Sequence, residues 1–376
     1  MVQGREKMNA SIYAARLSRD EAPGRVLQSL VEQSGILAKI KQGDKVLVKP
    51  NYVAPFPLAT TDSRILEFFI QALKDLGARP VVGEMSGYEF DTEATIKILG
   101  ILPVLERHGV EFVNFEQAPY ESLELDNGMQ VEVARIAREV DLIVNLPVLK
   151  GHTITKVTGA VKNLFGLLSR NSRRRLHCRR IHAGVAALAR SFPAAVHCVD
   201  ARSLLDRAVF GASKPLNVCM MGSNPFALDH FGSKLLGIDP DSVYHLEHVP
   251  SYTVTGDIPP VPVTELRSKN SLKECFHRMV YSSFYYLDEL NCGLLGRNSV
   301  IPELHWQLGV HPDVSRVDQE RIAEVCALCP VEAIDPEKRV VRKERCITVR
   351  CLRCYQYDPT GQVVLKGLNP PKGKGR

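Results

Sequence analysis

Short apolar runs alternate with amphipathic stretches along the first 240 residues of the chain. Residues 45–49 form an apolar, strand-like run that ends at Pro50. Residues 63–76 carry apolar side chains at helical spacing, and Gly77 follows where a helix-terminating glycine is expected. Four more strand-like runs are predicted at 80–83, 141–146, 195–200 and 216–220. Strands that alternate with helices predict an α/β fold, a mostly parallel sheet covered by helices on both faces.

The chain divides into four predicted segments. Residues 1–250 are expected to form the α/β substrate-binding core, with a further helix at 93–107 that is bent or stopped near Pro103. A proline-rich stretch opens a linker and packing segment at 251–314. A small ferredoxin-like α+β module is expected at 315–368, and a flexible basic tail at 369–376.

Composition and length set broad limits on the protein. The 376 residues leave room for one large and one small domain, and 45% hydrophobic and 24% charged residues are typical of a globular chain. The N-terminal residues lack the apolar run of a secretory signal, and no apolar run reaches the roughly 18 residues of a membrane span. The cysteines before residue 300 show no disulfide spacing. We therefore expect a cytoplasmic location and no membrane partner.

Five of the ten cysteines lie in the last 51 residues. Cys346, Cys351 and Cys354 follow one another with the spacing C-x4-C-x2-C, and Cys329 is followed by Pro330. In two-cluster ferredoxins, three cysteines of one run and the proline-flanked cysteine of the other run together hold one [4Fe-4S] cluster. The pattern therefore resembles one half of such a module, with Cys329, Cys346, Cys351 and Cys354 as the ligands of a single [4Fe-4S] cluster.

The ligands of the second cluster are missing from this pattern. Asp358 stands before Pro359 where a fourth cysteine is expected, and the second cluster's own triplet is absent. Four thiolates also suit a structural zinc ion, which is the alternative cofactor, and a metal-free relic is the third interpretation. Cys326 is left over, and we expect it to be a small buried apolar residue.

The densest polar stretch follows the strand predicted at 141–146. It carries Lys150 and His152, and then Lys162 and Asn163 on the next predicted helix. Positive charge and hydrogen-bond donors at the exit of a central strand suit the binding of an oxyanion or phosphate. His152 can also exchange a proton near neutral pH. These four are the candidate catalytic residues, and for the histidine alone a structural role is the alternative.

Six more polar residues are predicted to bind substrate in the same cleft. They lie at strand ends or helix starts: Lys49, Asn51, Thr60, Thr61, Asp200 and Asp229. The threonines precede a predicted helix and therefore suit an anion at its N-terminus. Helix capping is the alternative for a threonine, and capping or pairing with a lysine is the alternative for either carboxylate.

Six arginines lie between residues 170 and 180, with His177 among them and His182 just after. A solvated basic loop is the ordinary interpretation of such a run. The functional alternative is an anion site, to which both histidines would contribute as substrate-binding residues. Aromatic residues do not interleave with the arginines, so a nucleic-acid partner is not favoured.

A series of motifs resembles the prokaryotic domain-of-unknown-function family 362. The motifs occur in order at 48–51, 60–62, 83–84, 141–152, 158–166, 177, 199–201 and 222–229. Members often carry a C-terminal two-cluster ferredoxin module, which the resemblance implies here in a form that has lost one cluster. The bulky residues from Arg202 to Phe210 depart from the small-residue pattern expected there. The resemblance implies an iron–sulfur protein and assigns it no substrate.

Three functions are compatible with these features. The first is an oxidoreductase that binds a small anionic substrate in the basic cleft and passes single electrons through one [4Fe-4S] cluster, to the substrate or to a redox partner protein. The second is a non-redox lyase, isomerase or transferase whose cluster or zinc is structural. The third, ranked last, is a nucleic-acid-binding accessory protein that uses the arginine run.

Overall fold

A computed structural model gives the structure of the protein. It describes residues 9–87, 90–152, 154–192, 196–205, 213–262, 283–284, 286–288, 290–291, 311–347, 349 and 351–366. The predicted basic tail and most of the predicted packing segment lie outside these residues. Within them, no helix is both long enough and apolar enough to cross a membrane.

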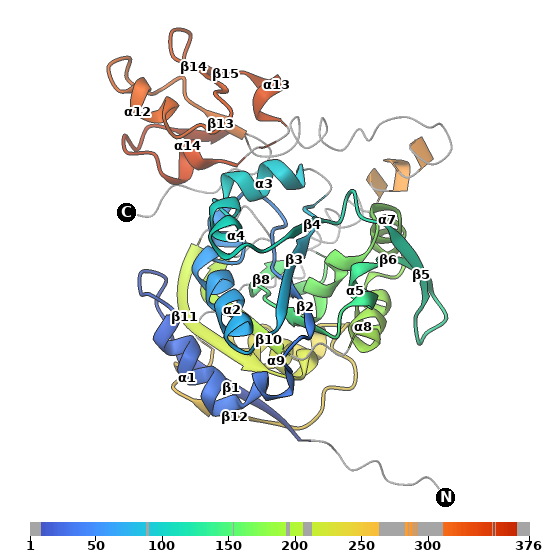
Figure 1. The fold of residues 1–376 in the computed structure, drawn as a ribbon. Helices are drawn as coiled ribbons and strands as arrows, with labels where there is room; N and C mark the ends of the chain where they lie inside the picture. The colour runs from blue at the N-terminus through green and yellow to red at the C-terminus, as the bar shows by residue number, and fades with distance from the viewer. Residues whose placement is uncertain are drawn as a thin grey trace, which may run out of the picture.

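An eight-stranded sheet forms the centre of the fold (Figure 1). Its strands are arranged in the order β12-β1-β11-β10-β7-β2-β3-β4. Their bounds in that order are Tyr252–Gly256, Ala10–Arg16, Ser213–Gly222, Val196–Leu205, Leu142–Asn145, Lys45–Lys49, Arg79–Glu84 and Phe112–Asn114. Among these strands only β11 runs against the others, because it pairs antiparallel with both β10 and β1. The mostly parallel sheet predicted from the sequence is therefore confirmed.

Helices cover both faces of this sheet. Their bounds are α1 Gly24–Ser34, α2 Ser63–Asp75, α3 Thr92–Ile98, α4 Leu102–His108, α5 Ile136–Glu139, α6 Ala160–Asn163, α7 Arg170–Arg179, α8 Ile181–Ser191 and α9 Pro225–Leu235. Val46 and Val48 of β2 face the core that contains α1, α2 and α4. Leu47, between them, faces the core built on α6 and α8. The alternation of β2 between two apolar cores explains why the strand reads as a continuous apolar run.

Two parts of the predicted organisation differ from the structure. The helix predicted at 93–107 breaks before Pro103: it is two helices, α3 and α4, because the chain turns at Gly100 with a positive φ of 70°. The linker predicted from residue 251 begins with a strand of the sheet instead, since β12 pairs parallel with β1. A strand whose partner residues are 242 positions away in the chain has no local signal that distinguishes it from a linker.

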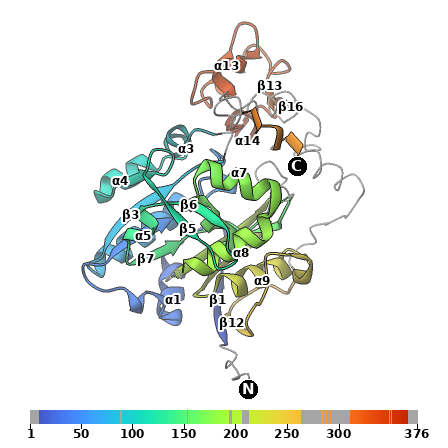
Figure 2. The same cartoon turned by 90° about the vertical axis from the view of Figure 1, so that its right-hand side faces the viewer.

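Short elements at the C-terminal end of the chain surround the cysteines. They are β13 His311–Asp313, α12 Ile322–Cys326, β14 Ile334–Asp335, β15 Val340–Val341, α13 Lys343–Cys346, α14 Arg353–Gln356 and β16 Val364–Lys366. The strands pair as two small antiparallel ladders, β13 with β16 and β14 with β15. We call residues 311–366 the cysteine module; Figures 1 and 2 show it beside α3, at one end of the central sheet.

The cysteine module is attached to the main body by an apolar contact and a hydrogen bond. Leu352 packs among Phe56, Ala59 and Phe90 in the segments that follow β2 and β3. Arg353 Nη1 donates to the carbonyl of Ile98 at the end of α3, at 3.1 Å. These contacts hold the cysteine module against the carboxyl-end loop of a central strand, where sites in parallel sheets form.

Candidate functional site

A row of buried amides crosses the carboxyl ends of the central strands. Lys150, on the hairpin strand β8 (Lys150–His152), donates through Nζ to Asn51 Oδ1 at 3.1 Å. Asn51 Nδ2 donates to Asn163 Oδ1 at 2.8 Å, and Asn163 Nδ2 donates to Asn145 Oδ1 at 2.7 Å. Asn145 Nδ2 lies 3.0 Å from His197 Nδ1. The predicted residues Lys150, Asn51 and Asn163 therefore share one network.

Backbone carbonyls fix the direction of this network. Asn163 Nδ2 also faces the carbonyls of Lys49 and Pro50, and Asn145 Nδ2 donates to the carbonyl of Ala160 at 2.9 Å. A flipped amide would turn its oxygen toward those oxygens, so the orientation shown is the one that satisfies every group. His197 Nδ1 must then accept, which makes the ring neutral; burial lowers the pKa of His197 to about 3.

Lys150 begins this network as a buried amine. Its side chain is 2% exposed, and Nζ also donates to the carbonyl of Ala59 at 2.5 Å. Burial lowers the pKa of Lys150 to about 7, against a smaller opposing effect of Glu84. Lys150 therefore changes charge near neutral pH, and the amide network responds to that charge.

His152 and Lys162 form the half-buried part of the site. Their Nε2 and Nζ atoms lie 2.6 Å apart. His152 Nδ1 accepts from the backbone N–H groups of Ile154 and Thr155, at 3.1 and 3.2 Å, in the turn before β9 (Lys156–Thr158). Burial, followed by the charges of Lys150 and Arg173, lowers the pKa of Lys162 to about 7.

Asp229 holds the helix that carries Lys162. Its two carboxylate oxygens accept from the N–H groups of Ala160 and Val161, at 2.6 and 2.9 Å, at the start of α6. Gly159 lets the carboxylate approach, because a Cβ there would lie 2.2 Å from Asp229 Oδ1. Burial raises the pKa of Asp229 to about 7. The structure thus assigns Asp229 the capping role that the sequence left as an alternative to substrate binding.

Lys49 forms a buried ion pair. Its Nζ pairs with Glu84 Oε2 and donates to the carbonyl of Pro50 at 3.0 Å, and Glu84 Oε1 accepts from Tyr52 N at 3.3 Å. Lys49 is fully buried and Glu84 is 3% exposed. Burial lowers the pKa of Lys49, and Glu84 opposes that shift. In this arrangement the amine of Lys49 is bound inside the protein and does not face solvent.

The remaining predicted cleft residues also make internal contacts. Thr61 Oγ1 donates to the carbonyl of Leu146 and accepts from Asn51 N, both at 2.7 Å, while Thr60 Oγ1 donates to the carbonyl of Phe56. Asp200 binds the guanidinium of Arg202 through both oxygens, at 2.9 and 2.8 Å. These groups position the loop after β2 and the end of β10.

Arg202, the first of the bulky residues that depart from the family pattern, binds the start of α2. Its side chain is fully buried and also pairs with Asp62 Oδ2 at 2.9 Å. Asp62 caps α2, since its side chain accepts from Arg64 N at 2.9 Å. The two carboxylates bind Nε and Nη2 of this buried arginine, while Nη1 has no hydrogen-bond partner within the described part of the chain.

The arginine run is helical and internally bonded. It forms α7, so the predicted solvated loop is wrong. Arg173 is 7% exposed and donates to the carbonyls of Met85, Ser86, Gly166 and Leu168. Arg170 pairs with Glu116, and Arg174 lies 3.8 Å from Asp288. The charge of Arg173 therefore acts inside the protein, beside Lys162 and His177.

Histidines surround the amine of Lys162. His177 packs edge-on against Phe165 at 5.3 Å between ring centroids, and burial followed by Lys162 lowers its pKa to about 3. His182 stacks on His245 with centroids 5.9 Å apart. His245 is fully buried, and neither ring nitrogen has a hydrogen-bond partner among the described residues. The predicted pair His177 and His182 thus lies in the same basic region as Lys162, which also perturbs His245.

Sequence reasoning did not select several residues of this region as site residues. They are Glu84, Asn145, His197, Arg202 and His245. Asn145 and Glu84 stand in the motifs quoted above, so their position at the ends of strands was a usable signal. His197 and His245 are isolated histidines in apolar sequence, where no spacing distinguishes them from core residues.

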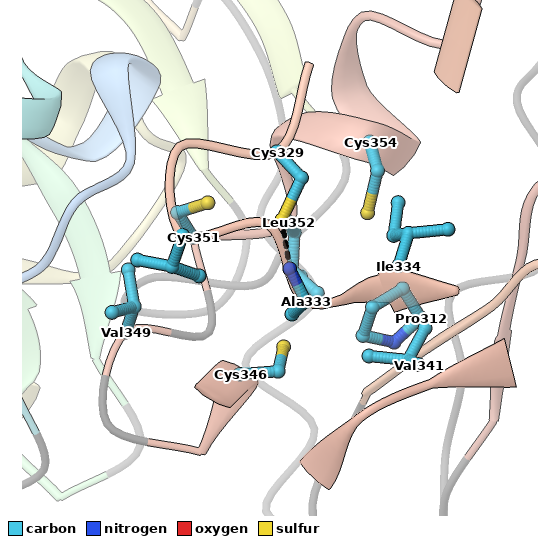
Figure 3. Close-up of a pocket in the computed structure, with 11 residues that line it drawn as sticks. Pro312, Cys329, Ala333, Ile334, Val341, Cys346, Val349, Cys351, Leu352 and Cys354 are labelled. Atoms are coloured by element: carbon cyan, nitrogen blue, oxygen red, sulfur yellow. Dashed lines mark hydrogen bonds between the residues drawn. The ribbon is translucent and has the colours of Figure 1, made fainter. Parts of the chain in front are cut away.

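The four predicted ligand cysteines line one pocket in the cysteine module. Figure 3 shows the sulfurs of Cys329, Cys346, Cys351 and Cys354 around a common space. The other lining residues are apolar: Pro312, Val331, Ala333, Ile334, Val341, Val349 and Leu352. Cys326 does not line the pocket and packs against the module's apolar core. Thiols are the donors that iron–sulfur clusters use, but among the described residues no three His, Cys, Asp or Glu side chains are grouped closely enough to hold a single metal ion.

Two local features act on the charge of the sulfurs in this pocket, in opposite directions. Ala333 N donates to Cys329 Sγ at 3.1 Å, and hydrogen bonds to sulfur set the potential of a cluster. Without a metal, burial raises the pKa of Cys351 to about 11, and burial with the neighbouring thiols raises the pKa of Cys354 further. A cation in the pocket would reverse that cost by stabilising the thiolates.

One apolar cluster borders both sites. Leu352 lines the cysteine pocket and belongs to the same buried cluster as Phe56, Ala59 and Phe90. The carbonyl of Ala59 accepts the hydrogen bond from Lys150 Nζ. Leu352 has a positive φ of 51°, a costly backbone conformation for a leucine. The cysteine pocket and the amide network therefore both contribute a residue to this cluster or bond to one.

Known proteins are similar to parts of this chain. A thylakoid-associated protein of Synechocystis sp. is 28% identical over 144 residues, which are 37% of this chain and 44% of that protein. The lactate racemase apoprotein from Thermoanaerobacterium thermosaccharolyticum superposes with a TM-score of 0.43 and 14% identity, covering 62% of this chain and 57% of that chain. This chain thus spans less than two thirds of the length of either protein.

The family assignment covers the segment that contains the amide network. Residues 46–234 match the family described as a domain of unknown function, DUF362. The matched half of the chain includes β2, β7, α6 and the start of α9, which supply Lys49, Asn145, Lys162 and Asp229. The family predicted from the ordered motifs is confirmed: the chain belongs to DUF362.

Proposed function

We propose that the chain is an iron–sulfur oxidoreductase. Its cysteine module would bind one [4Fe-4S] cluster through Cys329, Cys346, Cys351 and Cys354. A small anionic substrate would bind in the basic region around Lys150 and Lys162. The cluster would supply single electrons, exchanged with that substrate or with a partner protein.

The observation that carries this proposal is the junction at Leu352. This residue lines the cysteine pocket and lies in the same apolar cluster as Ala59, whose carbonyl binds Lys150. A purely structural metal has no need to lie next to the polar site, whereas an electron carrier does. The apolar lining of the pocket excludes water from the sulfurs, which suits a cluster of tuned potential.

Lys150 and Arg173 support the binding of an anion. The pKa of Lys150 is lowered to about 7. A negative substrate favours its protonated form, so binding would be coupled to proton uptake at Lys150 near neutral pH. Lys162 and His152 are half-buried, whereas Lys150 is 2% exposed. The fixed charge of Arg173 adds to the positive potential at the same place.

The first experiment is anaerobic purification of the full chain, with assay of iron, sulfide and zinc and an electron paramagnetic resonance spectrum after dithionite reduction. We expect about four irons and four sulfides per chain and a signal from a reduced [4Fe-4S] cluster. One zinc without iron would instead support a structural site and a non-redox enzyme. A purified chain that contains neither iron nor zinc would overturn the proposal.

Cysteine variants then separate an electron carrier from a structural metal. Cys354→Ser should abolish the spectrum, and Cys326→Ser is the matched control that should retain it, because Cys326 lies outside the pocket. If the cluster carries electrons, the Cys354→Ser protein keeps its circular dichroism spectrum and main thermal transition. Loss of the fold of the whole chain would indicate a structural role and contradict the redox proposal.

A further inference from the structure

The hydrogen bonds of His152 determine the charge of Lys162. Nδ1 of His152 accepts from two backbone N–H groups, those of Ile154 and Thr155. That nitrogen therefore carries no proton, and in a neutral imidazole the proton must be on Nε2. Nε2–H then donates across the 2.6 Å contact to Lys162 Nζ. An ammonium group has no lone pair with which to accept, so the geometry requires an uncharged amine.

The groups that face Lys162 reinforce this state. Lys150 comes from β8, Arg173 and His177 come from α7, and His245 lies in the segment after the 3₁₀ turn at residues 240–242. The positive charges of Lys150 and Arg173 disfavour a further one on Lys162, whereas His177 and His245, whose pKa values are lowered to about 3, are neutral. Burial is the largest cause and, with Lys150 and Arg173, lowers the pKa of Lys162 to about 7.

Lys162 is also held in place. It lies on α6, whose first N–H groups are bound by Asp229. The residue is half-buried, so part of it is open to solvent, while burial lowers the pKa of its amine. An uncharged, positioned primary amine is a nucleophile, and its usual electrophile in proteins is a carbonyl carbon.

We propose that Lys162 forms an imine with the carbonyl carbon of a small oxo acid, a carbonyl compound that also carries a carboxylate or phosphate. The amine adds to the carbonyl carbon to give a carbinolamine, which then loses water to form the C=N bond. No electron is gained or lost in this step. Arg173 and Lys150 supply the positive charge that favours the anionic group. His152, with its proton on Nε2, is the group within reach of the departing oxygen.

This inference deepens the proposed function, because it names the substrate class of the same cleft, and it does not require the cluster. The test uses glyoxylate as the probe and sodium cyanoborohydride, which reduces the imine to a stable secondary amine. The full chain is treated between pH 5 and 10 and digested, and the modified lysines are identified by mass spectrometry. We expect an adduct on Lys162 that forms with a midpoint near pH 7, whereas an ordinary exposed lysine has a pKa of about 10.4.

Three variants and one further probe make the test specific. Lys162→Met should lose the adduct, and Lys39→Met, at an exposed position in the 3₁₀ turn after α1, should leave it unchanged. His152→Phe removes the Nε2–H donor, so the midpoint should move toward higher pH by one unit or more. Formaldehyde, which lacks an anionic group, should modify Lys162 at least tenfold less efficiently than glyoxylate at the same concentration.

The outcomes distinguish this inference from the redox proposal. The reaction is run on iron-loaded and iron-free chain. An adduct on Lys162 in both forms supports the imine, whatever the iron analysis shows. Modification of Lys162 only at the pH of other lysines would overturn the inference and leave the cluster proposal untouched. Equal reaction with formaldehyde and glyoxylate would overturn the assignment of an oxo acid.

Discussion

The buried ion pair of Lys49 and Glu84 allows a direct test of how much this pair contributes to the unfolding free energy. The Lys49 side chain has no exposed surface, and that of Glu84 is 4% exposed. Lys49→Met removes one charge and leaves the other buried without its partner. Breaking a pair of this kind typically costs about 3–5 kcal/mol of unfolding free energy, most of it the desolvation of the remaining ion. We expect a loss in that range.

The reciprocal variant should behave differently. Glu84→Gln leaves Lys49 buried, but the pKa of Lys49 is already lowered by burial, and it can release its proton instead of remaining an isolated cation. The glutamine oxygen can still accept from Tyr52 N. The double variant Lys49→Met/Glu84→Gln leaves no buried charge, so it should be more stable than Lys49→Met alone. The coupling energy between the two sites should be about 2 kcal/mol or more.

Urea unfolding followed by far-UV circular dichroism measures this cycle. The matched control is the pair Arg190–Asp126, which has two close contacts, at 2.5 and 3.0 Å, and side chains that are 38% and 45% exposed. The cycle Arg190→Met/Asp126→Asn should give a coupling below about 1 kcal/mol, because water screens it. Additive effects at Lys49 and Glu84, within about 0.5 kcal/mol, would refute the reasoning.

Three further predictions concern the surroundings of the site. Asp229 binds its proton more tightly in the folded chain, with a pKa of about 7 against about 3.9 when unfolded. Its contribution to stability is therefore present below about pH 4 and falls as pH rises to 7. Asp229→Asn should flatten this pH dependence of the unfolding free energy, measured by urea titration at each pH. Gly166→Ala places a Cβ 2.6 Å from Lys49 Nζ and should lower the melting temperature through a loss of about 1–3 kcal/mol, whereas Gly24→Ala, with open space around it, should not. Leu352→Ala should cost about 2–4 kcal/mol and speed the reaction of the metal-free thiols with Ellman's reagent; an unchanged rate would show that Leu352 does not close the pocket.

The sequence was most informative for elements whose apolar residues recur at the spacing of a strand or a helix. Lys45–Lys49 reads as a strand because both of its faces are buried, and the structure has the same bounds. The helix predicted at 63–76 is observed at Ser63–Asp75, because its apolar residues recur on one buried face, and Gly77 follows with a positive φ of 74°. Regular burial against an apolar core therefore explains why these elements could be predicted.

Pairing between distant segments was not predictable in this way. Ala10–Arg16 enters the sheet between β11 and β12, and none of these strands is close to it in the chain. Glu84 is a single acidic residue at a strand end, and only the fold places it beside Lys49. The capping role of Asp229 depends in the same way on α6, which begins 69 residues earlier. Such contacts depend on topology, which periodicity does not encode.

The fixed direction of the amides from Lys150 to His197 limits where protons can go. Each asparagine is anchored by its neighbours, so the row cannot turn over to accept a proton from Lys150 and release one at His197. It transmits polarisation only, because every dipole points the same way. Proton exchange with a bound substrate is thereby confined to the half-buried side of the site, where His152 and Lys162 lie. His197, at the other end of the row, stays neutral across the physiological pH range because its pKa is lowered to about 3.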